Sequence, residues 1–190
     1  YKRQLMDVDE YYLMDKEAET VPIGAERLLY LPYLMGERTP HLDPDARGVF
    51  FGLSAMHTKK HMLRAVMEGV AYSLRDCVEV FREMGINVSD MMACGGGGTS
   101  PLWRSMLADL YGCEVKTPAS KEGPALGAAL LASVGAGIYG SVPEAVKAVV
   151  RTDKVCQPDS SRMERYDEFY SLYREIYPAL KDSFSRLATL

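Results

Sequence analysis

The 190-residue sequence contains no run of Lys or Arg, and its formal net charge is −4 at pH 7. Nucleic acids and anionic lipids bind to basic surfaces, so this composition argues against both as partners. The four cysteines form no C-x-x-C pair, and no signal-like segment begins the sequence. These absences favour reduced thiols in a cytoplasmic protein.

Long hydrophobic runs are also missing. Residues 123–143 carry no charge, but they are rich in Gly and Ala and include two prolines. A membrane-spanning helix needs about 20 predominantly apolar residues, so we expect no membrane insertion. With 47% hydrophobic and 25% charged residues, the composition is typical of one globular domain with a core.

What is present is an alternation of strand and helix patterns. Apolar residues at three- and four-residue steps predict a long helix over 58–84, capped by Gly85, and an aromatic stripe predicts a C-terminal helix over 161–187, kinked or broken at Pro178. We expect that stripe to pack in the core, although homodimerisation through this helix stays open. The alternation favours an α/β fold with a parallel crossover. Strands are expected at 27–34, 48–53, 91–94 (buried) and 113–117, with a small-residue helix close to the sheet at 123–137.

Four consecutive glycines, Gly95 to Gly98, are the most unusual local feature. Bare backbone is kept where side chains would obstruct a ligand or another backbone. The glycines follow the strand at 91–94 and precede Ser100 and Pro101, an N-cap and first-residue pair for a helix ending at Gly112. This order places backbone N–H groups and a positive helix end at the C-terminal edge of a sheet, where anionic or nucleotide ligands bind.

Two alternatives compete with a nucleotide at the glycine run. The glycines permit tight strand-to-helix packing without any ligand, or they belong to a dinucleotide-binding loop. Gly95 and Gly97 fit the first two positions of G-x-G-x-x-G, but Ser100 occupies the third. The nearby acid, Glu114, falls inside the next strand and not at its end, which argues against the dinucleotide alternative.

Two polar clusters are better explained by structure than by chemistry. His57 and His61 have the i, i+4 spacing of a metal pair, with Glu68 further along, but no third ligand converges on them, so we assign no metal site. The loop "GERTPHLDPDARG" concentrates charged side chains that we expect to tie an irregular backbone through hydrogen bonds. Trp103 is expected to anchor the core.

Four segments, in this order, carry a resemblance to a known family: "LPYLMGERTPHLDPDARGVFFGLS", "RAVMEGVAYSLRD", "GGGGTSPLWRSMLADLYGCEV" and "GPALGAALLA". Together they resemble the C-terminal domain of the FGGY carbohydrate kinases, from about Leu28 through the C-terminal helix. Within that family, "GERTPH" is more similar to xylulokinases than to gluconokinases or glycerol kinases.

The resemblance implies an actin-like (ribonuclease H-like) α/β fold, a mixed sheet flanked by helices. It also implies that residues 1–190 are the ATP-side, N-terminally truncated domain of an enzyme that transfers the γ-phosphoryl group of Mg-ATP to a sugar. D-xylulose is the expected sugar, with gluconate, glycerol and ribulose as alternatives. The expected partners are the sugar, ATP and the N-terminal domain of the same protein. The catalytic aspartate, the sugar site and the Mg²⁺ ligands would lie outside this chain, so no catalytic residue or metal ligand is assigned within it.

The resemblance further places the adenosine of ATP against the glycine run and the start of the next helix. The expected binding residues are Gly95, Gly96, Gly97, Gly98, Thr99 and Ser100. The family has a basic residue where this chain has Thr99, so that cation is missing here, and Leu102 is expected as an apolar wall. A non-catalytic actin-like nucleotide-binding module is the alternative function.

Overall fold

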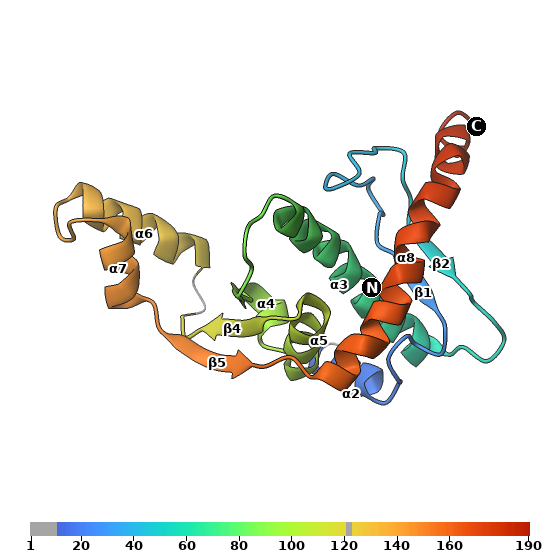
Figure 1. Ribbon diagram of the computed structural model, residues 1–190, viewed down its shortest axis with the longest axis horizontal. Helices are drawn as coiled ribbons and strands as arrows, with labels where there is room; N and C mark the ends of the chain where they lie inside the picture. Colours follow the sequence, from blue (N-terminus) through green and yellow to red (C-terminus); the bar gives the residue numbers. More distant parts are fainter. Residues whose placement is uncertain (1–10, 121–122) are drawn as a thin grey trace.

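The computed structural model describes residues 11–120 and 123–190. In Figure 1 the helices α3, α5 and α8 gather at one side, and strands β4 and β5 lead from them to an outlying pair, α6 and α7. The elements are, in chain order, α2 (Tyr11–Glu19), β1 (Leu29–Leu31), β2 (Val49–Phe51), α3 (Lys59–Glu83), β3 (Asp90–Met92), α4 (Gly95–Gly98), α5 (Pro101–Tyr111), β4 (Glu114–Pro118), α6 (Gly123–Gly135), α7 (Val142–Val149), β5 (Thr152–Cys156) and α8 (Ser160–Leu187).

The strands form two small sheets. β1 and β2 pair antiparallel, whereas the second sheet has the order β3-β4-β5, with β3 and β4 parallel and β5 antiparallel to β4. α4 and α5 connect the parallel pair, so the expected α/β class with a mixed sheet is confirmed. The expectation that the strand near Met91 is buried is wrong. Asp90 and Met92 are exposed because β3 pairs with β4 alone among the described strands.

Helix α3 packs against β1 and begins and ends where the sequence predicts. Thr58 and His61 form a capping box at its start, and Gly85 follows its end with a left-handed φ of 79°. The approach to β1 is close because Gly69 has no side chain. A Cβ at Gly69 would lie 2.1 Å from the carbonyl oxygen of Tyr30.

The aromatic stripe of α8 lies in the core, as expected, so its tyrosines do not form a partner surface. Tyr166, Tyr170 and Tyr173 surround the ring of Tyr72 on α3, with centroid distances of 6.4, 5.9 and 5.1 Å. Pro178, where a kink or a break is predicted, lies inside α8, and the helix continues past it without a break. Buried side chains on both sides of the proline hold it. The buried α8 residues are Tyr166, Phe169, Tyr170, Tyr173, Ile176, Tyr177 and Phe184.

Helix α6 does not lie against the sheet, contrary to the sequence expectation. It packs on α7, and Figure 1 shows the pair standing apart from α3, α5 and α8. Only Leu130 of α6 is buried, because α7 is the one described element against which α6 packs to any extent. Among the residues that the structure describes, no helix has the length and apolar character needed to cross a membrane.

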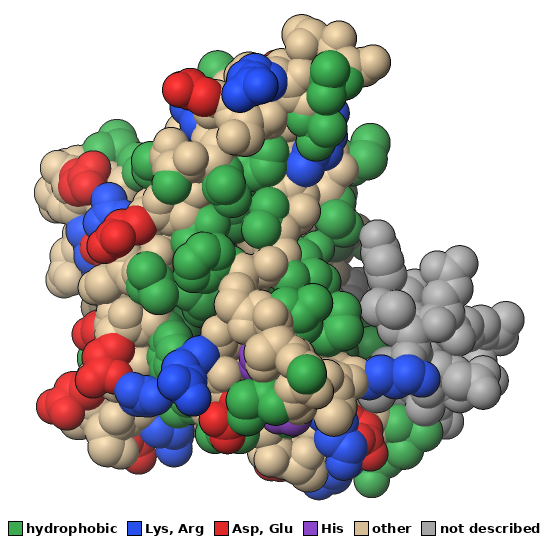
Figure 2. Space-filling model, turned by 90° about the vertical axis from the view of Figure 1, so that its right-hand side faces the viewer, with side chains coloured by type: hydrophobic (Ala, Val, Ile, Leu, Met, Phe, Trp, Pro, Cys, Tyr) green, Lys and Arg blue, Asp and Glu red, His purple; other side chains and the backbone are tan. Residues whose placement is uncertain are grey.

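Hydrophobic side chains are also frequent on the surface. Figure 2 shows one such face, where they lie between scattered acidic and basic groups. Ten residues enclose a hollow of about 240 Å³ between α3 and the β1–β2 sheet, and nearly all of them are apolar. The described part of the chain therefore leaves apolar surface uncovered near β1 and β2.

The hydroxyl of Tyr72 gives a test of the core. It is the one fully buried side-chain polar atom without a hydrogen-bond partner in the part of the chain that the structure describes. Tyr72→Phe should therefore raise the free energy of unfolding by about 1 kcal/mol, because an unsatisfied buried hydroxyl is costly. Tyr170→Phe is the matched control. The Tyr170 hydroxyl donates to Asp76 Oδ1 at 2.6 Å, so its loss should cost about 1–3 kcal/mol. Equal destabilisation of both variants in urea unfolding would contradict this account.

The contact between α3 and β1 gives a second test. Gly69→Ala should lower the free energy of unfolding by about 1–3 kcal/mol, because the added methyl group meets backbone that cannot turn aside. Gly127→Ala on α6 is the control, since its Cβ meets nothing within 4 Å and alanine favours helix by up to about 1 kcal/mol. Thermal unfolding that showed the same sign for both variants would argue against the close approach.

Candidate nucleotide-binding site

The glycine turn, Gly95–Gly98, forms the short helix α4 and not an open loop. Thr99 closes it, because its backbone N–H and its Oγ1 both donate to the carbonyl oxygen of Gly96, at 3.2 and 2.7 Å. The N–H of Ser100 donates to the carbonyl of Gly97 at 3.1 Å. The turn therefore has a defined shape set by its own backbone.

The four glycines are present for different reasons. Gly95 has a φ of 75°, a conformation that disfavours other residues, and a Cβ at Gly98 would lie 2.5 Å from the carbonyl oxygen of Ala93. A Cβ at Gly97 would contact Trp103 Nε1 at 3.4 Å, which is ordinary packing. At Gly96 a Cβ would meet nothing within 4 Å, and φ is not positive. Packing without a ligand thus explains Gly95 and Gly98 but requires glycine at neither Gly96 nor Gly97, and only Gly96 of these two lines the hollow described next.

A hollow of about 430 Å³ lies beside the glycine turn. Its volume is within the range of ligand pockets, about 300–1,000 Å³. The parallel strands β3 and β4 both end here, which is where ligands bind in α/β sheets. Residues from the start of β5 complete the wall. The lining residues are Ala93, Gly95, Gly96, Gly98, Thr99, Arg104, Thr117, Pro118, Ala119, Ser120, Asp153 and Lys154.

The structure divides the six predicted binding residues. Gly95, Gly96, Gly98 and Thr99 line the hollow, whereas Gly97 and Ser100 do not. Ser100 Oγ accepts a hydrogen bond from the N–H of Trp103 at 3.0 Å and caps α5. Leu102, expected as an apolar wall, is also absent from the lining. Binding by these residues stays a prediction.

Positive charge is present in the hollow, although the basic residue that the family has at Thr99 is missing from this chain. Arg104 and Lys154 both belong to the lining. Arg104 is 7% exposed, and its Nη1 donates to the carbonyl oxygen of Gly98 at 2.6 Å. A local signal for Arg104 existed. It stands four residues after the N-cap Ser100, and helical side chains lean toward the N-terminus, hence toward the glycine turn.

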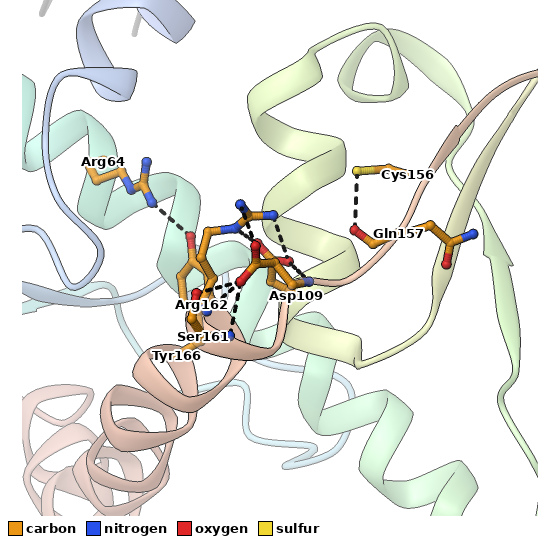
Figure 3. A network of polar contacts seen from close by, with 8 residues as sticks. Arg64, Asp109, Cys156, Gln157, Ser161, Arg162 and Tyr166 are labelled. Atoms are coloured by element: carbon orange, nitrogen blue, oxygen red, sulfur yellow. Dashed lines mark hydrogen bonds and ion pairs between the residues drawn. The ribbon is translucent and has the colours of Figure 1, made fainter.

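A polar network fixes the other half of α5 (Figure 3). Asp109 is 3% exposed, and its carboxylate accepts hydrogen bonds from Arg162 Nε at 2.6 Å and from the N–H of Asp159 at 2.8 Å. Asp159 in turn caps α8 through Ser161. The hydrogen bond to Asp109 raises the pKa of Arg162 above its ordinary value. α5 and the start of α8 are therefore joined directly.

The two histidines of the predicted helix start hold backbone in place. His57 Nδ1 accepts from the N–H of Ser54 at 2.9 Å, and His61 Nδ1 accepts from the N–H of Thr58 at 3.0 Å. Glu68 is turned away to an ion pair with Arg64 at 2.6 Å. Within residues 11–120 and 123–190, no three His, Cys, Asp or Glu side chains are grouped so as to hold a metal ion.

The charged loop at 36–48 is structural, as the sequence predicts. Asp43 Oδ1 accepts from the N–H groups of Asp45 and Ala46 at 2.9 and 3.2 Å, and Oδ2 accepts from the Tyr177 hydroxyl at 2.7 Å. The bond from Tyr177 is the largest cause that lowers the pKa of Asp43. His41 stacks on Tyr177 with ring centroids 3.9 Å apart.

Known proteins share this architecture. The model of the FGGY family of carbohydrate kinases, C-terminal domain, matches residues 2–136. The xylulose kinase of Bacillus subtilis is 38% identical over 182 residues, covering 96% of this chain and 36% of that protein. A gluconokinase of Bacillus licheniformis is 35% identical over 184 residues, with the same two shares of 96% and 36%.

A solved structure agrees with these relatives. The ligand-bound xylulose kinase from Lactobacillus acidophilus matches with a TM-score of 0.88 at 32% identity, over 98% of this chain and 38% of that one. This chain thus spans a little over a third of the length of the relatives it matches. The expected actin-like α/β fold is confirmed. From the family model, the relatives and the shared fold, the chain belongs to the FGGY family of carbohydrate kinases.

Proposed function

We propose that the protein phosphorylates a sugar with ATP, and that residues 1–190 form the C-terminal, ATP-side domain of the enzyme. In this proposal the adenosine lies against the glycine turn. The observation that supports it is Gly96. Neither its backbone conformation nor its packing requires glycine, and it lines a hollow of about 430 Å³ at the C-terminal ends of two parallel strands.

The residues present fit the nucleoside end of a nucleotide. Gly96, Thr99 and Thr117 line the hollow, and its charged lining residues, Arg104, Lys154 and Asp153, are positive in sum. ATP bound with Mg²⁺ would supply the phosphoryl group, whose transfer depends on positioning and charge stabilisation. Within the proposal, this chain binds and orients the nucleoside, and the Mg²⁺ ligands lie outside it.

D-xylulose is the sugar we propose, because xylulose kinases are similar both in sequence and in structure. Gluconate is the nearest alternative. The gluconate kinase from Lactobacillus acidophilus has a TM-score of 0.87, only 0.01 below that of the xylulose kinase. Glycerol and ribulose are weaker alternatives. The further domain of the family would bind the sugar in the cytoplasm, and closure of the two domains would exclude water.

A non-catalytic nucleotide-binding module remains the second candidate, since the hollow is within the size range of ligand pockets and no described residue is assigned to catalysis. The dinucleotide alternative loses support. Glu114, the acid that would have to reach a ribose, begins β4 and is paired with Lys116 at 2.9 Å, and it accepts a hydrogen bond from Gln157. It does not line the hollow.

Gly96→Val tests the nucleotide site. The valine side chain would enter the hollow, so affinity for ADP should fall at least about tenfold while the free energy of unfolding changes by less than about 1 kcal/mol. Gly97→Val is the matched control, because its side chain would face Trp103 and not the hollow. Calorimetric titration of both variants gives the comparison. An unchanged affinity in folded Gly96→Val would make the turn purely structural.

The division of labour within the family gives a second test. The 190-residue chain by itself should release no sugar-dependent ADP from ATP, because the catalytic base and the sugar site are expected elsewhere. A coupled assay with D-xylulose, gluconate and glycerol measures this, with a complete xylulose kinase as the positive control. Sugar-dependent turnover above the blank by the chain alone would refute the assignment.

A further inference from the structure

Arg104 is a buried arginine that forms no ion pair with any residue that the structure describes. It is 7% exposed, and the hydrogen bond from Nη1 to the carbonyl oxygen of Gly98, at 2.6 Å, is the only polar contact of its side chain among the described residues. A guanidinium group stays protonated in proteins and carries five N–H donors. A buried charge without an opposite charge is unfavourable, so an anion bound beside Arg104 would stabilise this site.

The fold pairs its other arginines of low exposure with carboxylates. Arg64 is 4% exposed and forms an ion pair with Glu68 at 2.6 Å. Arg75 binds Asp167 at 2.5 Å. Asp153 lines the same hollow as Arg104, but no ion pair joins the two. Arg104 therefore differs from its counterparts both in having no carboxylate and in lying at a hollow.

The hollow itself suits an anion. Arg104 and Lys154 both line it, and the C-terminal ends of β3 and β4 open on it. The donors of Arg104 that do not reach Gly98 have no hydrogen-bond partner in the described part of the chain, and they are not among its fully buried polar atoms, so a ligand could reach them. Arginine binds phosphate oxygens through short, charge-assisted hydrogen bonds that often form in pairs.

We propose that Arg104 binds a phosphate oxygen of the nucleotide while its bond to Gly98 fixes the end of the glycine turn. This inference rests on the proposed function and deepens it. It makes the phosphorylated nucleoside, and not the nucleoside alone, the ligand that the hollow selects. It also gives this chain a cation that replaces the basic residue missing at Thr99.

The two contributions of Arg104 are separable by substitution. Arg104→Gln keeps an N–H donor for the carbonyl of Gly98 but removes the charge. Arg104→Lys keeps the charge but loses the planar fork. Lys147→Gln on α7 removes an exposed positive charge that does not line the hollow, and controls for long-range electrostatics.

The experiment is calorimetric titration of the full chain and the three variants with adenosine, AMP and ADP, with unfolding curves to confirm that each variant folds. We expect the wild-type chain to bind ADP more tightly than adenosine. In Arg104→Gln, affinity for ADP should fall about 10- to 100-fold and affinity for adenosine less than about threefold. Arg104→Lys should keep most of the preference for ADP, and Lys147→Gln all of it.

Several outcomes overturn the proposal. Equal loss of adenosine and ADP binding in Arg104→Gln would reduce Arg104 to a support of the turn. Wild-type binding of adenosine and ADP with equal affinity would refute the phosphate contact and leave the proposed function standing. Failure of the wild-type chain to bind adenosine, AMP or ADP would remove the proposed function together with this inference. If Arg104→Gln does not fold, Arg104→Lys decides. Equal affinities of Arg104→Lys for adenosine and ADP would also refute the contact.

Discussion

The position of α5 is the constraint on which the candidate site depends, because the glycine turn is attached to the start of this helix. Asp109 fixes the later part of α5 by accepting hydrogen bonds from Arg162 and Asp159, both at the start of α8. Ser100 and Arg104 fix its first turn. A buried carboxylate that lost these donors would be costly. The position of the glycine turn therefore depends on the contact of α5 with the start of α8, about 50 residues further along the chain.

α8 is in turn positioned by its aromatic stripe. Tyr166 accepts a hydrogen bond from Arg64 Nη2 at 2.8 Å, and Arg64 also holds Glu68, whose carboxylate accepts from the N–H of Gly24. Burial raises the pKa of Glu68, while the guanidinium of Arg64 opposes that shift. The core thus combines apolar burial with a satisfied polar network, which specifies one arrangement of α3 and α8. α6 and α7 do not belong to this network. They lie between β4 and β5 in the chain, so these strands determine where the two helices stand.

Local signals in the sequence were enough to predict where the capped helices begin and end. Thr58, Ser100 and Gly112 mark helix ends by chemistry that acts within four residues, and the structure places the ends there. The exposed edge of β3 and the detachment of α6 were not predictable in this way, because burial depends on which elements pack together. The pair of Asp109 and Arg162, 53 residues apart, leaves no local pattern at all. Arg104 carried a usable signal through its spacing from Ser100, but its burial becomes visible only in the fold.

The run of four glycines therefore combines two kinds of position: glycines that the fold requires and glycines that it does not require. Each glycine inside a helical turn costs roughly 0.5–1 kcal/mol relative to alanine, so a fold keeps one only for a reason. Gly95 and Gly98 serve the fold, since one needs a left-handed φ and the other lies against the carbonyl of Ala93. Alanine would fit at Gly96 without strain or clash. A stability argument alone would place alanine there, so glycine at this position is consistent with the proposed nucleotide in the hollow.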